Sequence, residues 1–87
     1  MPTKRTPDRL EWRVRSAADL GRALAGARRQ RGWTQEQLAQ NLEIDRSYLS
    51  ELESGSSALV LQRTLQALRR LGADVTVTVR SDDGPPR

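Results

Sequence analysis

The stretch from Thr34 to Gly55, TQEQLAQNLEIDRSYLSELESG, limits the possible folds of this chain more than any other. It contains two short apolar patterns at helical spacing, separated by a few residues that favour a turn. The positions predicted to face inward are Leu38 and Leu42 in the first helix and Leu49 and Leu52 in the second. The other positions are mostly polar, so each helix keeps a polar outer face.

The residues at the helix ends fit this interpretation. Thr34 and Asp45 are suitable N-caps for the two helices, and Gly55 is suited to end the second one. Ile44 fills the turn, while Ala39 is small where the second helix crosses. The pattern predicts a helix-turn-helix, which places its second helix in the major groove of DNA. The alternative is an ordinary pair of antiparallel helices in a small bundle.

One residue departs from the usual pattern of this motif. The backbone just before Ile44 normally becomes left-handed and carries glycine, whereas this chain has Glu43. A non-glycine residue in that conformation costs about 1 kcal/mol. Either Glu43 accepts this cost or the turn has a different shape.

Composition narrows the possible functions. With 87 residues, 36% hydrophobic and 30% charged, the chain is expected to form one folded domain with a small core. It has no Cys and no His, so we predict no metal site, no cofactor and no enzymatic activity. No segment is apolar enough to span a membrane and no secretory signal opens the chain. We expect a cytoplasmic, nucleoid-associated bacterial protein.

The net charge of +4 favours a polyanionic partner, but it is unevenly distributed. Residues 1–31 carry a net charge of +6, residues 32–60 carry −4, and residues 61–87 carry +2. The motif expected to contact DNA is therefore acidic, and the basic residues surround it.

The segments outside the motif complete a mainly α fold with four helices. Residues 1–9 read as a flexible basic arm, residues 10–80 as the helix-turn-helix domain with flanking strands, and residues 81–87 as a disordered tail. A first helix is predicted from about Ala17 to Arg31, capped by Ser16. A fourth begins at about Leu59 or Leu61 and ends at Leu71. Its expected inward residues are Leu61, Leu65, Leu68 and Leu71.

Two segments alternate as half-buried strands do, Leu10–Arg15 and Asp74–Arg80. The second needs a partner, because a lone strand exposes a row of unpaired backbone groups. That partner is either the first strand of the same chain or a strand of a second subunit. Pairing across a two-fold axis would form a β-layer in a homodimer, with Val75, Val77 and Val79 as the dimerisation residues.

Several short runs resemble the Xre/Cro-type repressor domain, which is lambda-repressor-like. These runs are RGWTQ at 31–35, Leu38-Ala39, and YLSELESG at 48–55, within a resemblance that covers roughly residues 17–72. The last helix followed directly by LGADVTVTV is similar, more narrowly, to HipB-type antitoxins. In that family the C-terminal strand joins its counterpart in the second subunit.

The resemblance implies roles for particular residues. Gln35 would contact phosphate, Arg46, Ser47 and Ser50 would meet base edges, and Glu51 would lie at the margin. Tyr48 would contact phosphate or a thymine methyl group. Arg28 and Glu53 match a buried ion pair of the family. The candidate DNA-binding residues are Thr34, Gln35, Arg46, Ser47, Tyr48, Ser50, Glu51 and Ser56.

The expected function is sequence-specific repression of transcription through double-stranded operator DNA. The HipB resemblance further implies an antitoxin of a type II toxin–antitoxin pair that autoregulates its operon and neutralises a HipA-type Ser/Thr kinase toxin. The alternatives are a stand-alone Xre-type repressor and a protein-binding adaptor module that uses the motif only as a scaffold.

Overall fold

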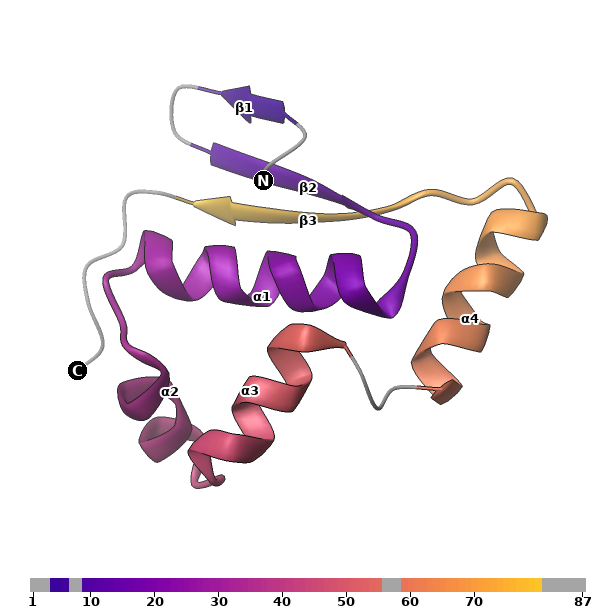
Figure 1. Ribbon diagram of the computed structural model, residues 1–87. Coiled ribbons are helices and arrows are strands. Elements are labelled where there is room, and N and C mark those ends of the chain that lie inside the picture. The colour runs from indigo at the N-terminus through magenta and orange to yellow at the C-terminus, as the bar shows by residue number, and fades with distance from the viewer. Residues whose placement is uncertain (1–3, 7–8, 56–58, 81–87) are drawn as a thin grey trace.

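A computed structural model describes residues 4–6, 9–55 and 59–80 of the chain (Figure 1). It is mainly helical with a small antiparallel sheet, which confirms a mainly α helix-turn-helix architecture. In chain order the elements are β1 (Lys4–Thr6), β2 (Arg9–Val14), α1 (Ala17–Gln30), α2 (Gln35–Leu42), α3 (Arg46–Ser54), α4 (Leu59–Arg70) and β3 (Val75–Arg80).

The two predicted strands pair with each other within the chain. The sheet has the order β1-β2-β3, and β2 runs antiparallel to β3 with Trp12 opposite Val77 and Leu10 opposite Val79. Lys4–Thr6, inside the segment expected to be a flexible arm, instead form β1 and pair with β2. The predicted tail at 81–87 lies outside the described residues.

The core lies between this sheet and α1. Trp12, Ala23 and Val79 form its buried cluster, and Val77 packs against them. Gly26 lies against this cluster, because a Cβ atom there would lie 2.2 Å from the indole ring of the buried Trp12 and would force that ring to shift. The strands cover one side of α1, as Figure 1 shows.

The other side of α1 packs against α3 at very short range. A Cβ atom at Gly21 would lie 2.2 Å from the carbonyl oxygen of Glu53, so only glycine permits this approach. A Cβ atom at Gly55, which has a φ of +70°, would lie 2.5 Å from the carbonyl oxygen of Ala17. The position of α3 is therefore fixed by backbone contacts to α1.

Several leucines predicted to face the core are exposed. In α4 only Leu65 is buried, while Leu71 is 80% exposed because it follows the end of the helix at Arg70. Leu42 and Leu52 are 49% and 40% exposed. Leu52 lines an apolar hollow with Leu59 and Val60 of α4. The helix α4 packs beside the N-terminal half of α1 and does not cover α2 (Figure 1).

Candidate nucleic-acid interface

The first helix of the motif, α2, begins with a complete capping box. The N–H of Gln37 donates to Thr34 Oγ1 at 3.1 Å, and the Thr34 N–H donates to Gln37 Oε1 at 2.8 Å. This confirms Thr34 as the N-cap. The reciprocal bonds fix the direction in which α2 starts, and with it the position of Gln35.

The turn between α2 and α3 has the left-handed geometry of the motif. Glu43 has φ 58° and ψ 43°, and it is the sole non-glycine residue with positive φ in the described parts of the chain. The N–H of Ile44 donates to the carbonyl of Ala39 at 3.0 Å, which closes the turn. The chain therefore accepts the conformational cost of Glu43 and keeps the usual turn shape.

The second helix, α3, is held by one deeply buried side chain. Leu49 is 0% exposed and Ala39 is 3% exposed where the two helices meet. Asp45 occupies the predicted N-cap position with extended backbone, but its side chain makes no capping hydrogen bond. The carboxylate of Asp45 is exposed at the start of α3, so the predicted position was right and the predicted capping bond was wrong.

The exposed face of α3 carries most of the residues predicted to read DNA. Four of these residues are exposed and lie on the side of α3 that faces away from the buried Leu49: Arg46, Ser47, Ser50 and Glu51. A helix that buries one stripe and leaves a polar face to solvent is how this motif presents its recognition helix. The structure thus brings these four residues onto one surface.

Two other candidates are placed differently. Tyr48 is 52% exposed and lines an apolar hollow with Leu52 and Val60, which Glu51 also borders. Thr34 is exposed, although its hydroxyl is already used in the capping box. Ser56 lies outside the described residues.

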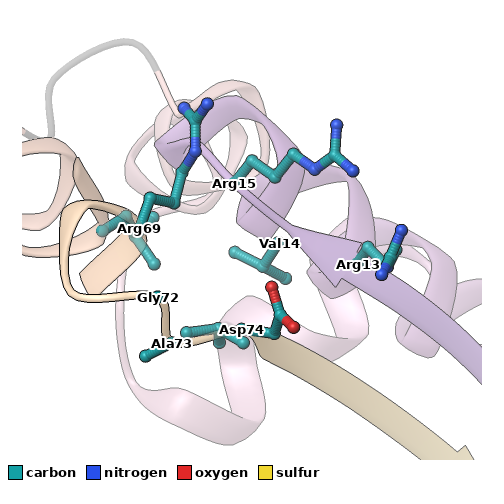
Figure 2. A pocket seen from close by; sticks show the side chains of 9 residues that line it. Arg13, Val14, Arg15, Arg69, Gly72, Ala73 and Asp74 are labelled. Carbon is teal, nitrogen blue, oxygen red and sulfur yellow. The ribbon is translucent and has the colours of Figure 1, made fainter. Parts of the chain in front are cut away.

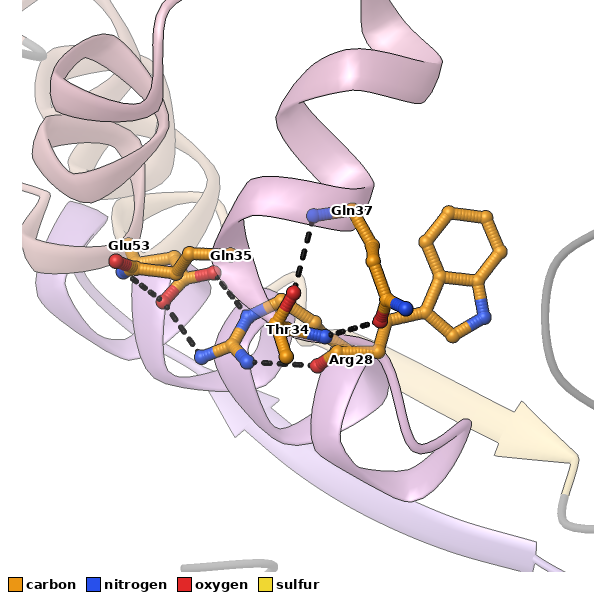
Figure 3. Close-up of polar contacts among 6 residues, drawn as sticks. Arg28, Thr34, Gln35, Gln37 and Glu53 are labelled. Atoms are coloured by element: carbon orange, nitrogen blue, oxygen red, sulfur yellow. Dashed lines mark hydrogen bonds and ion pairs between the residues drawn. The ribbon is translucent and has the colours of Figure 1, made fainter.

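A buried ion pair joins α1 to the end of α3 (Figure 3). Arg28 Nε donates to Glu53 Oε2 at 2.7 Å and Arg28 Nη2 donates to Glu53 Oε1 at 3.2 Å. Arg28 also donates to the carbonyl oxygen of Trp33 at 2.9 Å. This agrees with the pairing that the family resemblance implied, and it holds α1, α3 and the start of α2 together.

Gln35 completes this network. Its Nε2 donates to Glu53 Oε1 at 3.0 Å, a contact not anticipated from the sequence. Burial would raise the pKa of Glu53, but the hydrogen bonds from Arg28 and Gln35 outweigh it and leave that pKa below its ordinary value. The side chain of Gln35 is thus held beside the recognition helix, and its phosphate contact stays a prediction.

A separate hollow of about 240 Å³ lies where β2, the end of α4 and the start of β3 meet (Figure 2). Its lining includes Arg13, Arg15, Arg69 and Asp74. In Figure 2 the guanidinium groups of Arg13, Arg15 and Arg69 point in different directions. They therefore do not converge on one ligand position.

The described residues lack two further kinds of feature. None of the helices there has the length and apolar character needed to cross a membrane. The same residues include no group of three His, Cys, Asp or Glu side chains placed to hold a metal ion.

The fold and the exposed face of α3 define a protein of the helix-turn-helix class. The chain belongs to the helix-turn-helix domain family, whose model matches residues 19–80. Membership of this family indicates DNA binding. Neither the curated proteins nor the solved structures gave a significant match.

Proposed function

We propose that this protein is a sequence-specific DNA-binding repressor whose recognition helix is α3. The observation that carries the proposal is the exposed polar face of α3 on a helix fixed by Leu49 and by the Arg28–Glu53 pair. Arg46 can donate two hydrogen bonds to guanine O6 and N7, and Glu51 can accept from cytosine N4. These contacts give base discrimination to a surface that carries little net positive charge of its own.

The experiment that tests DNA binding is a titration of fluorescent duplexes at several salt concentrations. A duplex enriched from a random library should bind more tightly than an unrelated duplex of equal length. Both affinities should fall steeply as salt rises, because binding releases counterions from the phosphates. Absence of a complex at low salt, or an affinity independent of salt, would favour the adaptor function instead.

A homodimer is the second part of the proposal. The side chains of Val77 and Val79 pack in the core of their own chain, so they do not present a free surface to a second subunit. The outer backbone edge of β3, in contrast, has no strand beside it among the described residues. Pairing of two such edges would extend the sheet across two subunits and place two recognition helices for two half-sites. Sedimentation velocity at low micromolar concentration should give the mass of two chains.

We further propose that the repressor is the antitoxin of a type II toxin–antitoxin pair. The support is the resemblance of α4 followed directly by β3 to HipB-type antitoxins. Purification of the tagged protein from its own cells should then recover a stoichiometric Ser/Thr kinase of the HipA type. Recovery of the chain with DNA but no second protein would favour a stand-alone repressor.

A further inference from the structure

A groove of about 420 Å³ runs between α1 and the helix-turn-helix unit. Trp12, Ala25 and Gly26 line one part of it, and Glu53 and Ser54 line another. Its polar rim combines Arg22 and Arg29 of α1 with Gln35 of α2 and Ser50 of α3. Two candidate DNA contacts, Gln35 and Ser50, thus line the same groove as two arginines of α1, which lies outside the helix-turn-helix motif.

The charges around the groove favour an anion. Glu53 is its acidic lining residue, but this carboxylate is paired with Arg28 and is only 8% exposed. Arg22 is paired with Asp19, yet the side chain of Arg22 stays 59% exposed. Arg29 is exposed on the same face of α1, about two helical turns further on. The solvent-facing charge of the rim is therefore positive.

The position of the groove relative to the recognition helix suggests the source of the anion. Ser50 lies on the exposed face of α3 proposed to meet base edges, and Gln35 begins α2. In helix-turn-helix complexes the first helix of the motif crosses the DNA backbone while the second lies in the major groove, so a backbone strand is expected near α2. The positive end of a helix favours phosphate there. The rim arginines extend this favourable region onto α1.

We propose that this groove receives a phosphate group of the DNA backbone, with the guanidinium of Arg29 as its direct partner and Arg22 as a supporting charge. This inference rests on the proposed DNA binding. It explains how an acidic motif holds DNA: α3 supplies the base contacts and α1 supplies part of the electrostatic attraction. Such a phosphate contact strengthens binding to every sequence equally.

The test compares Arg29→Gln, Arg29→Lys and Arg69→Gln with the unchanged protein. Arg69 is the matched control, because it is an exposed arginine in the last turn of α4, at the other end of α1 from α2 (Figure 1). Affinities are measured for a selected duplex and an unrelated duplex at several salt concentrations. Melting curves verify that each variant folds as the unchanged protein does.

Arg29→Gln should lower both affinities by the same factor, about five- to tenfold near 0.1 M salt, and reduce the salt slope by about 0.9. Arg29→Lys should keep most of the slope, since Lys also binds phosphate as a point charge. Equal slopes for Arg29→Gln and Arg69→Gln would overturn the inference while leaving the proposed function intact. If the unchanged protein binds neither duplex, the proposed function fails and the groove inference fails with it.

Discussion

Glu53 accepts hydrogen bonds from Arg28, 25 residues earlier in the chain, and both side chains are less than 10% exposed. The pair lies where α1, α2 and α3 meet, and Gln35 adds a third hydrogen bond to the same carboxylate. Because α3 carries the proposed base contacts, this pair links the stability of the domain to the position of its recognition helix.

Removing one partner of this ion pair should destabilise the domain strongly. Arg28→Met leaves the Glu53 carboxylate buried without its main partner, and we expect a loss of about 3–5 kcal/mol in the free energy of unfolding. The double variant Arg28→Met/Glu53→Met should recover much of this loss, because no uncompensated charge remains. Urea unfolding at pH 7 measures both; a single variant within about 1 kcal/mol of the unchanged protein would mean that the pair behaves as a surface contact.

The same pair predicts how stability changes with acid. The pKa of Glu53 is lowered on folding from an ordinary value of 4.5, so its contribution is fully present well above pH 4.5. It should decline as the pH falls through 4.5 and be lost below the lowered pKa. The pKa of Asp19 is lowered as well, chiefly by the N–H of Arg15, and it acts in the same direction. The free energy of unfolding of Glu53→Gln should change less between about pH 6 and pH 3 than that of the unchanged protein, a range that spans the ordinary carboxylate pKa of roughly 4. An equal change in both proteins would contradict the role of Glu53.

The left-handed turn predicts a stabilising substitution. Glycine adopts the φ of 58° seen at Glu43 without strain, so Glu43→Gly should raise the free energy of unfolding by about 0.5–1 kcal/mol. The control is Glu36→Gly in the first turn of α2, which should instead lower stability, by up to about 1 kcal/mol. Thermal melting measures both, and a lower melting temperature for Glu43→Gly would show that this side chain stabilises the turn.

The close approach of α1 and α3 predicts the opposite sign for a glycine. Gly→Ala inside an exposed helix usually stabilises by about 1 kcal/mol. Gly21→Ala should destabilise instead, since its Cβ would lie 2.2 Å from a backbone oxygen of Glu53 that cannot move away without shifting α3. Gln30→Ala, at an exposed position of the same helix, serves as the control. A Gly21→Ala variant as stable as the control would show that the helices separate at little cost.

Local signals in the sequence predicted the motif well. Thr34 as a cap and Leu49 as an inward-facing residue of α3 follow from short-range rules that the structure obeys. The sequence left two possibilities open at Glu43, and the structure has the left-handed one. The alternation in Leu10–Arg15 likewise predicted β2, with a shift of one residue at each end. The Arg28–Glu53 pair came from the family resemblance, because nothing in its spacing indicates a contact.

Features that depend on tertiary neighbours were not predictable in this way. Helical spacing assigns Leu52 and Leu71 to an apolar face, but it does not say whether another element covers that face. The hydrogen bond from Gln35 to Glu53 joins residues 18 positions apart and depends on how α2 and α3 cross. β1 had no apolar alternation to indicate it, and it forms by pairing with β2.

The proposed base contact of Arg46 can be separated from general DNA affinity. Arg46 is exposed at the start of α3, so Arg46→Ala should leave the fold intact. Loss of the Arg46 guanidinium should remove about 1–3 kcal/mol of base discrimination at one guanine-containing position of a selected duplex. The affinity for unrelated duplexes should fall much less. Arg70→Ala, which removes an exposed arginine from the last turn of α4, is the control and should leave base preference unchanged. Measured on a panel of single-base variants, an unaltered preference in Arg46→Ala would assign sequence reading to other residues of α3, whereas a loss confined to one position would identify the base pair that Arg46 contacts.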